Sequence, residues 1–490
     1  MRRPSILLCT EGTYPHYLGG VSVWCDQLIR RIPHADFRVL SVVHSPCQQS
    51  RFDIPSNVIS VTAVPLWGTE SPGDLPEPVS ITCARRSKTD AAAVESLFVP
   101  PFRIALRSIL QSGGDPAAFG LALLEIHNYL QSHELHRTFR TAAPWDAFLE
   151  ELAASERFRA ISMSEAAICL GWLVRFFSIL AAPLPEVDVA HSSMAGLAGI
   201  PCVLLRIRDG IPYVLSEHGI LIREVYTAMA SSSYPDVCRA FLIAFHRAVG
   251  SLNYHFADVI TSLGEFNKRW QVRFGADPAK IHYFPNGVDT TRFKPTPALS
   301  PVPLVLTLAR IYPLKGITTL IEAAAIVKEF VPGVRFRIMG EAADKLYFEE
   351  CKALVARHGL ESTVEFGETS EPAEEYGKAW LYCLPSVSEA MPYVVLEAML
   401  SGCPVAATDV GNVAETLGGC GVLARPNDPA DLAAKIVPLL RGPEAAARRR
   451  KMAAAGLRRG LASFTLDAAT SRFRELYWEL LECQPLSQAS

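Results

Sequence analysis

The sequence predicts an α/β protein of two domains, each a parallel β-sheet covered by helices. Short apolar runs rich in β-branched residues alternate with helical patterns along both halves of the chain, as strands and crossover helices do. The 490 residues also exceed what one hydrophobic core usually organises. A content of 49% hydrophobic and 20% charged residues excludes disorder, collagen and coiled coil.

Seven strands are expected in the first half of the chain and six in the second. The first seven lie near residues 5–10, 37–43, 58–64, 187–191, 213–217, 259–262 and 281–284. The other six lie near residues 304–309, 334–339, 364–366, 381–384, 405–408 and 421–423.

The expected domains are residues 1–288 and 304–464. Residues 289–303 are expected to be a linker, because their prolines disfavour both a helix and an interior strand. Residues from about 67 to 185 break the strand rhythm and predict a helical insertion in the first domain. Residues 465–490 form a tail with an amphipathic helix. Its apolar stripe consists of Phe473, Leu476, Tyr477, Leu480 and Leu481.

Charge and cysteine content exclude two classes of function. The 47 basic and 50 acidic residues leave a net charge of -3, and the longest basic run is 448–451. We therefore expect no nucleic-acid partner. The twelve cysteines form no CxxC pair, which argues against a zinc knuckle and favours reduced thiols in the cytosol.

No targeting or membrane segment is expected. The apolar run that follows residues 1–3 is broken at Thr10, so it is too short for a signal peptide and suits a first strand. The most apolar stretch, residues 166–184, carries Arg175 at its centre and Pro183 near its end. A buried or partner-facing helix is therefore favoured over a membrane span.

Gly19 and Gly20 lie in the loop between the first strand and the first helix. Glycines at such a junction let the backbone approach a ligand, and the helix start attracts phosphate. The alternative is a tight turn that needs positive φ. No GxGxxG or GxxxxGK[ST] motif is present, so dehydrogenase and P-loop functions lose their main support.

Two cations follow the first strand of the second domain. Arg310 and Lys315 come just after residues 304–309, at the sheet edge where open α/β folds bind ligands. Such a pair suits a diphosphate whose negative charge grows as a bond to it breaks. The alternative is a pair of solvated loop charges.

A third candidate segment spans residues 385–399. Pro392 suits the first turn of a helix that Gly402 ends, which puts Glu389 in the preceding loop and Glu397 about one and a half turns inside. The N–H groups of residues 391–394 then face an anion. Acceptors for sugar hydroxyls beside donors for phosphate describe a nucleotide-sugar site, although Glu389 could also merely stabilise the helix start.

Together these motifs resemble the GT-B glycosyltransferases of family 4 over nearly the whole chain. The resemblance rests on the Glu-x7-Glu pair Glu389 and Glu397, followed by GCPV at 402–405. It rests also on EGTYP at 11–15, GGVS at 19–22, EHGI at 217–220 and PNGVD at 285–289. These last motifs are similar to the PelF branch, cytoplasmic transferases that use UDP-glucose in Pel exopolysaccharide synthesis.

The resemblance implies two Rossmann-like domains, with a closing helix that crosses back onto the first. It implies that Gly19 and Gly20 lie against the diphosphate and the acceptor, that Arg310 and Lys315 neutralise the leaving phosphates, and that Glu397 holds the ribose. Further donor contacts are implied for Glu389 and the backbone of Ala390, Met391, Pro392 and Tyr393. His218 is implied to lie near the reacting centre, whereas His133 and His136 are expected to be surface residues.

The implied activity is metal-independent transfer of a hexose from a nucleotide diphosphate, with retention and without a cofactor. The expected partners are a nucleotide-sugar donor, a saccharide acceptor and a membrane polysaccharide-synthase complex at the inner face of the membrane. The alternatives are a catalytically idle subunit of such a synthase and a nucleotide-sugar isomerase. Asn412, where the family often has a small residue, and the compact stretch after Gly340 leave the donor open.

Overall fold

The computed structural model describes residues 3–46, 48–69, 78–111, 113–296 and 298–482. The chain forms two compact units. The first comprises Met1–Ser262, Lys268–Tyr283 and Phe473–Ser490, and the second comprises Leu263–Asn267 and Phe284–Arg472.

The first unit contains a seven-stranded sheet in the order β3-β2-β1-β4-β5-β6-β7, with every pair parallel. The order reverses direction between β1 and β4, which creates a topological switch point. The strands are β1 (Ser5–Glu11), β2 (Asp36–Val43), β3 (Val58–Pro65), β4 (Val189–Ser192), β5 (Tyr213–Glu217), β6 (Val259–Ser262) and β7 (Ile281–Tyr283).

The second unit repeats this plan with six parallel strands in the order β10-β9-β8-β11-β12-β13. Its switch point lies between β8 and β11. The strands are β8 (Leu304–Leu308), β9 (Arg335–Met339), β10 (Val364–Gly367), β11 (Leu381–Leu384), β12 (Val405–Thr408) and β13 (Val422–Ala424). The predicted α/β class, with its two parallel sheets, is therefore confirmed.

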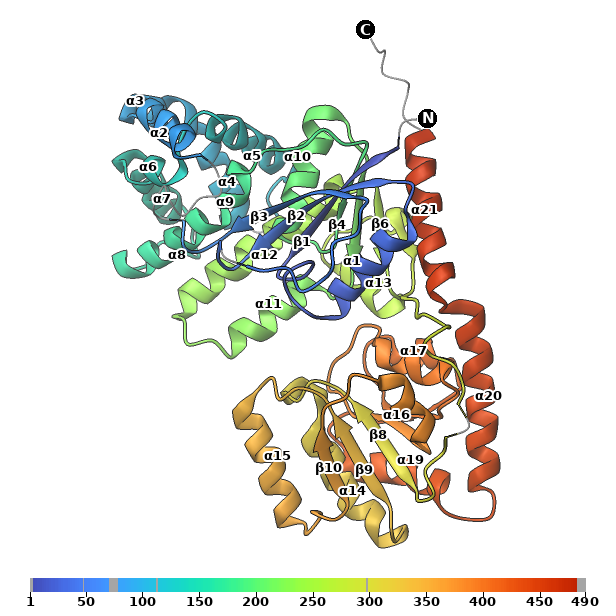
Figure 1. Cartoon of the computed structure of the whole chain (residues 1–490). Coiled ribbons are helices and arrows are strands. Elements are labelled where there is room, and N and C mark those ends of the chain that lie inside the picture. Colours follow the sequence, from blue (N-terminus) through green and yellow to red (C-terminus); the bar gives the residue numbers. More distant parts are fainter. Residues whose placement is uncertain (1–2, 47, 70–77, 112, 297, 483–490) are drawn as a thin grey trace. The chain divides into compact units, whose positions relative to one another are not determined.

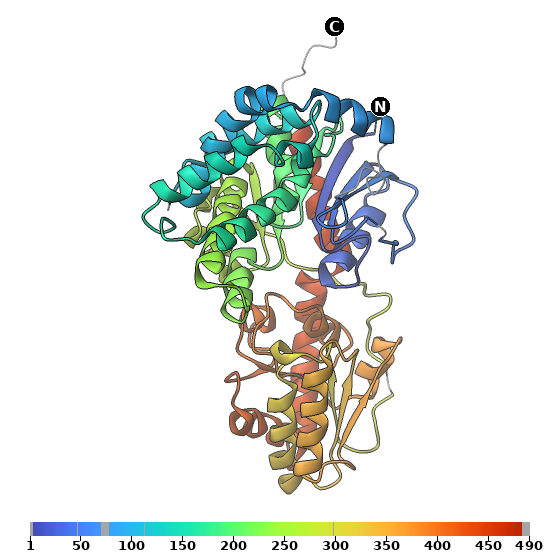
Figure 2. The ribbon, with the colours of Figure 1, turned by 90° about the vertical axis from the view of Figure 1, so that its left-hand side faces the viewer.

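Helices cover the sheet of the first unit, and α2 to α9 gather in a helical layer at its side (Figures 1 and 2). This layer packs on α10 and α12 and shares one apolar core with the sheet. The helices are α1 (Gly20–Arg31), α2 (Val79–Lys88), α3 (Ala91–Ala93), the π-helix η2 (Val94–Phe98), α4 (Val99–Leu110), α5 (Pro116–Leu130), α6 (Leu135–Thr138), α7 (Ala142–Ala154), α8 (Met163–Phe176), α9 (Ser178–Ala181), η3 (Leu197–Gly199), α10 (Ile200–Asp209), α11 (Leu221–Ala230), α12 (Asp236–Phe256), α13 (Glu265–Arg273) and η4 (Pro278–Lys280).

In the second unit, α14 packs against α15 and α19, and α17 packs against α20. Apolar side chains of these helices and of the sheet form the core. The helices are η5 (Pro313–Lys315), α14 (Ile317–Phe330), α15 (Lys345–Arg357), α16 (Pro372–Lys378), α17 (Tyr393–Leu400), α18 (Val413–Leu417), α19 (Pro429–Leu440), α20 (Ala445–Ser463) and α21 (Leu466–Glu482), which starts in this unit.

One helical segment of the described residues, Met163–Ala181, is long and apolar enough to cross a membrane by length and composition alone. Its mean hydropathy is 1.5, and 44% of its most apolar window is buried inside the protein. Ala166, Cys169 and Leu173 on this segment belong to the core of the first unit. A core helix passes the same test, so the segment is weak evidence for a membrane span.

The chain enters the second unit at Phe284, earlier than the predicted end of the first domain at residue 288. The reason is backbone pairing. Val288 donates its N–H to Phe464 O at 2.9 Å and accepts from the N–H of Leu466 at 2.9 Å. Residues 284–288 and the predicted linker, 289–303, therefore belong to the second unit where they are described.

The second half of α21 belongs to the first unit. The Phe473 ring lies 5.4 Å from that of Trp24, and Tyr477 Oη lies 2.5 Å from His191 Nδ1. His191 is buried, which lowers its pKa to about 3, so the ring is neutral. Thr261 donates to Ser216, whose hydroxyl lies 2.7 Å from His191 Nε2. Because Ser216 accepts from Thr261, its own hydroxyl proton is directed to His191 Nε2. A neutral imidazole has one donor and one acceptor nitrogen, so His191 Nδ1 is then the donor to Tyr477 Oη.

We predict that Tyr477→Phe lowers the free energy of unfolding by about 1–3 kcal/mol, because it leaves the buried Nδ1–H of His191 without an acceptor. Chemical denaturation of the variant and the wild type checks this. Tyr226→Phe is the matched control, since Tyr226 is 40% exposed. Equal losses in the two variants would contradict the assigned bond.

Candidate functional site

The strongest candidate site of the second unit lies where β8 and β11 end, at its topological switch point. Lys315 follows β8 and Glu389 follows β11, and Lys315 Nζ lies 2.5 Å from Glu389 Oε1. Ser386 Oγ donates to the same oxygen at 2.8 Å. The side chains of Lys315 and Glu389 are 19% and 11% exposed, so the pair is largely shielded yet accessible. The structure thus brings together two residues that are 74 positions apart.

The two loops that carry this pair are in close backbone contact. Gly316 has φ of 61°, and a Cβ there would lie 2.1 Å from Pro385 O. Any other residue would separate the loops or strain the backbone. Val387 also donates its N–H to Leu314 O at 2.9 Å. Lys315 is therefore held beside Glu389 by the backbone as well as by its charge.

Arg310 lies apart from the ion pair. Its guanidinium lies 5.5 Å from the centre of the Tyr312 ring, and Lys315 Nζ lies 5.8 Å from the same centre. Arg310 is exposed. Two cations therefore flank one aromatic ring beyond the end of β8, an arrangement that can receive two phosphate groups.

The loop before α17 is fixed by backbone contacts from two directions. Asn286 Nδ2 donates to Met391 O at 3.0 Å, and the N–H of Asn412 donates to Ala390 O at 2.9 Å. A Cβ at Gly411 would lie 1.7 Å from Glu389 O. These contacts hold Glu389 and its neighbours in one conformation, a role that the sequence analysis did not assign to Asn286.

Helix α17 begins at Tyr393, so Pro392 precedes the helix as its N-cap residue and is not in the first turn as predicted. The reason is the extended backbone of Pro392, with φ of −72° and ψ of 125°. The first turn leaves backbone N–H groups without intrahelical acceptors. Its partial positive charge lies a few residues after Glu389 in the sequence and favours an anion.

Asn412 has a structural role that a small residue could not fill. It is 2% exposed. Its Oδ1 accepts from the N–H of Phe266 at 2.9 Å, and its Nδ2 donates to Asn267 Oδ1 at 3.0 Å. The amide thus ties residues 263–267 to the loop that supports Ala390. The sequence indicated this role only in that Asn412 stands where the family often has a small residue.

Glu397 lies on α17 and is mostly shielded. Burial raises the pKa of its carboxyl to about 7, although the hydrogen bond from Tyr376 Oη at 3.0 Å lowers it in part. The same hydroxyl lies 2.9 Å from Val394 O. A carboxyl that changes charge near neutrality suits hydroxyl recognition.

The predicted residues of the first unit form a second group. Gly19 caps α1 with φ of 169°, and no atom lies within 4 Å of a Cβ built on it. This backbone is extended, and neither Gly19 nor Gly20 lies in the left-handed region that Gly12 occupies with φ of 59°. The alternative interpretation, a tight turn that needs positive φ, is therefore wrong for this pair. Neither backbone strain nor close packing explains why residue 19 is a glycine.

His218 follows β5 and packs against Trp24, with ring centres 4.4 Å apart. The preceding residue, Glu217, is 1% exposed and accepts from Tyr254 Oη at 2.7 Å. Burial raises the pKa of Glu217 to about 7. Sequence reasoning assigned no role to this carboxyl, although the EHGI motif contains it.

Metal ligands are not clustered in the part of the chain that the structure describes, where no group of three His, Cys, Asp or Glu residues could hold an ion. His133 stacks on Tyr129 at 4.1 Å, and His136 Nε2 lies 3.2 Å from Thr69 Oγ1. Both histidines therefore have protein partners.

Comparison with protein families gives two matches. Residues 4–279 match the family described as domain of unknown function (DUF3492). Residues 302–442 match the family described as glycosyl transferases group 1.

Curated relatives cover part of the chain. It is 31% identical to a D-inositol 3-phosphate glycosyltransferase of Segniliparus rotundus over 55% of this chain and 60% of that protein. It is 32% identical to an exopolysaccharide phosphotransferase of Streptomyces coelicolor over 46% of this chain and 24% of that protein. The match thus spans less than two thirds of either relative.

Solved structures share the fold over almost the full length. Sucrose-phosphate synthase from Thermosynechococcus elongatus aligns with a TM-score of 0.62 and 18% identity, over 99% of this chain and 100% of that one. HepE from Anabaena, solved with UDP-glucose, aligns with a TM-score of 0.59 and 16% identity, over 97% of this chain and 100% of that one. These identities establish a shared GT-B fold alone.

We predict that Glu397→Gln flattens the pH dependence of stability. Below about pH 4.5 the carboxyl is protonated in both the folded and the unfolded chain, and as the pH rises toward 7 only the unfolded chain ionises. The wild type should therefore lose up to about 3 kcal/mol across this window, relative to the variant. Thermal unfolding between pH 5 and 7.5 measures this, with exposed Glu361→Gln as the control. Parallel curves for wild type and Glu397→Gln would contradict the raised pKa.

Proposed function

This chain belongs to the GT-B glycosyl transferases of group 1 that carry a DUF3492 domain. From that premise we propose that the protein transfers glucose from UDP-glucose to a saccharide, with retention of the anomeric configuration and without a metal ion. The observation that carries the proposal is the Lys315–Glu389 pair at the switch point of the second sheet. The pair supports the proposal because an ammonium group suits phosphate and a carboxylate beside it suits sugar hydroxyls.

The second unit would bind the donor. Lys315 and Arg310 hold the two phosphates, and Glu397 accepts from the ribose hydroxyls. Glu389 and the backbone of Ala390, Met391, Pro392 and Tyr393 hold the hexose. The fixed conformation of this loop orients the hexose without reorganisation during the reaction.

The chemical step breaks the bond between the anomeric carbon and the diphosphate oxygen. Negative charge then grows on the leaving diphosphate, so its contact with Lys315 strengthens as the bond breaks and stabilises the transition state more than the ground state. A leaving phosphate oxygen takes the proton of the acceptor hydroxyl as that hydroxyl attacks from the same face. In this scheme no protein side chain forms a covalent intermediate.

The first unit would contribute Gly19, Gly20 and His218. The open space at Gly19 supports this assignment, because a backbone without side chains can approach a diphosphate or an acceptor. His218 would contact the transferred hexose. We further propose a cytoplasmic, PelF-like role in exopolysaccharide synthesis, beside a membrane synthase. The Streptomyces relative with an exopolysaccharide name supports this part of the proposal.

The test is UDP-glucose turnover by the purified full-length protein. Without an acceptor, slow hydrolysis should release α-glucose first, as followed by proton NMR, and excess EDTA should not change the rate. GDP-mannose and ADP-glucose should bind more weakly than UDP-glucose in calorimetry.

Each alternative predicts a different outcome of this test. An isomerase would form a second UDP-sugar without releasing UDP, and an idle subunit would bind the donor without turnover. Release of β-glucose, or activity that needs Mn²⁺, would contradict the proposed mechanism.

A further inference from the structure

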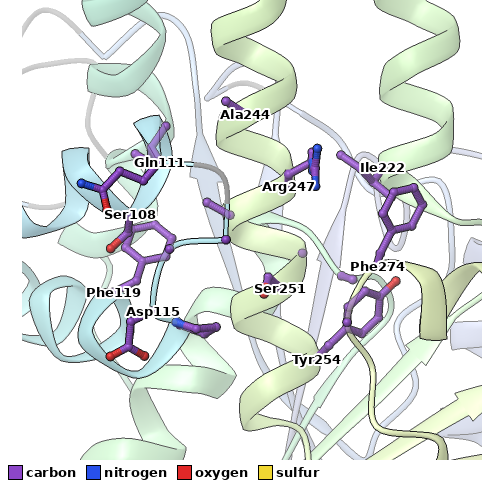
Figure 3. Close-up of a pocket in the computed structure, with 18 of the residues that line it drawn as sticks. Ser108, Gln111, Asp115, Phe119, Ile222, Ala244, Arg247, Ser251, Tyr254 and Phe274 are labelled. Carbon is purple, nitrogen blue, oxygen red and sulfur yellow. The ribbon is translucent and has the colours of Figure 1, made fainter. Parts of the chain in front are cut away.

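A groove of about 440 Å³ lies on the first unit, between α11, α12 and α13, outside the residues assigned above. Three arginines and three aromatic residues line most of it: Arg223, Tyr226, Arg247, Trp270, Arg273 and Phe274. A cavity of about 280 Å³ adjoins the groove and shares Arg247, Arg273 and Phe274 with it. Figure 3 shows Arg247 projecting from α12 toward the side of Ile222 and Phe274.

Two of the three groove arginines, Arg247 and Arg273, carry positive charge without a neighbouring carboxylate in the described part of the chain. Arg247 and Arg273 are exposed, and no carboxylate of the described residues lies within 4.0 Å of either guanidinium. No carboxylate lines the groove among these residues. On α11, Glu224 turns toward Gly219, where a Cβ would lie 2.2 Å from its Oε1. Asp236 on α12 pairs with Arg239.

The adjoining cavity has two described carboxylates, and neither forms an ion pair with Arg247 or Arg273. Asp115 accepts from the N–H of Ala117 at 2.9 Å, and Glu217 accepts from Tyr254 Oη at 2.7 Å. Burial also raises the pKa of Glu217 to about 7, which reduces its charge near neutrality. An anion entering the groove would therefore meet guanidinium groups with little competition.

The aromatic side chains add a surface for stacking. Trp270 and Phe274 are stacked, with ring centres 5.8 Å apart and planes 19° apart. The Arg273 guanidinium lies 5.2 Å from the centre of the Trp270 ring. Aromatic faces bury the apolar face of a sugar ring, while arginines bind carboxylate or phosphate in bidentate geometry. The same groove can thus bind both parts of one ligand.

We propose that this groove binds an anionic saccharide, one that carries carboxylate or phosphate, as the acceptor of the transfer. The acceptor role rests on the proposed function. Helix α11, which lines the groove with Arg223, Tyr226 and Thr227, begins directly after the loop of His218, a residue assigned to the reacting centre.

The test compares ligand binding by the full-length wild type, the double variant Arg247→Gln/Arg273→Gln and the control Arg140→Gln. Arg140 is exposed and lies outside the groove. The probes are trigalacturonate, glucose 6-phosphate, neutral maltotriose, inorganic phosphate and UDP-glucose, measured by calorimetry. The carboxylate and phosphate probes distinguish the two sources of negative charge.

We expect at least one anionic saccharide to bind more tightly than maltotriose and than inorganic phosphate. The double variant should weaken this binding by about tenfold or more, whereas Arg140→Gln should not. UDP-glucose should bind all three proteins equally.

Three results would overturn the proposal: no binding of either anionic saccharide, equal binding by the double variant, or loss of UDP-glucose binding in the double variant. If UDP-glucose still binds and turns over when neither anionic saccharide binds, the groove proposal fails while the proposed transferase stands.

Discussion

The ion pair between Lys315 and Glu389 is the interaction around which the candidate site is arranged. It joins the loops after β8 and β11, at the point where the strand order reverses. Shielding a pair of charges incurs a desolvation cost that their attraction offsets only in part. The pair therefore contributes little to stability. Gly316, Ser386 and the backbone contacts between the two loops nevertheless hold it in place, which favours a role in binding.

The supporting contacts restrict this part of the second unit to one arrangement. Thr408 Oγ1, at the end of β12, donates to Leu384 O at 3.3 Å and also bonds to Ser386 O. Asn286 and Asn412 hold the carbonyls of Met391 and Ala390. The ends of β8, β11 and β12, together with Asn286 in the segment that enters the unit, thus position Glu389. Such preorganisation lowers the cost of orienting a ligand.

Much of the fold was predictable from the sequence. Strands buried by helices on both faces are short continuous apolar runs, and each of the predicted strands lies within two residues of an observed one. The positions of Lys315 and Glu389 after strands were also predictable from local pattern. Their contact was not, because it depends on β8 and β11 being neighbours, and strand order is a property of the whole sheet.

Other features depend on contacts between segments far apart in the chain. The entry into the second unit at Phe284 follows from pairing of Val288 with residues 464–466. The extended backbone of Gly19 cannot be read from a Gly-Gly pair, which suits turns equally well. The arginine groove was missed because Arg223, Arg247 and Arg273 are each single charges on separate helices, with no spacing that links them.

The most direct measurement of the central claim is the affinity for UDP and for UDP-glucose of wild type, Lys315→Met and Glu389→Gln. If Lys315 binds the diphosphate and Glu389 binds the hexose, Lys315→Met weakens both ligands by about tenfold or more. Glu389→Gln then weakens UDP-glucose but leaves UDP unchanged or tighter, because Lys315 loses its internal partner. Unchanged UDP affinity in Lys315→Met, or equal losses of both ligands in Glu389→Gln, would contradict the account.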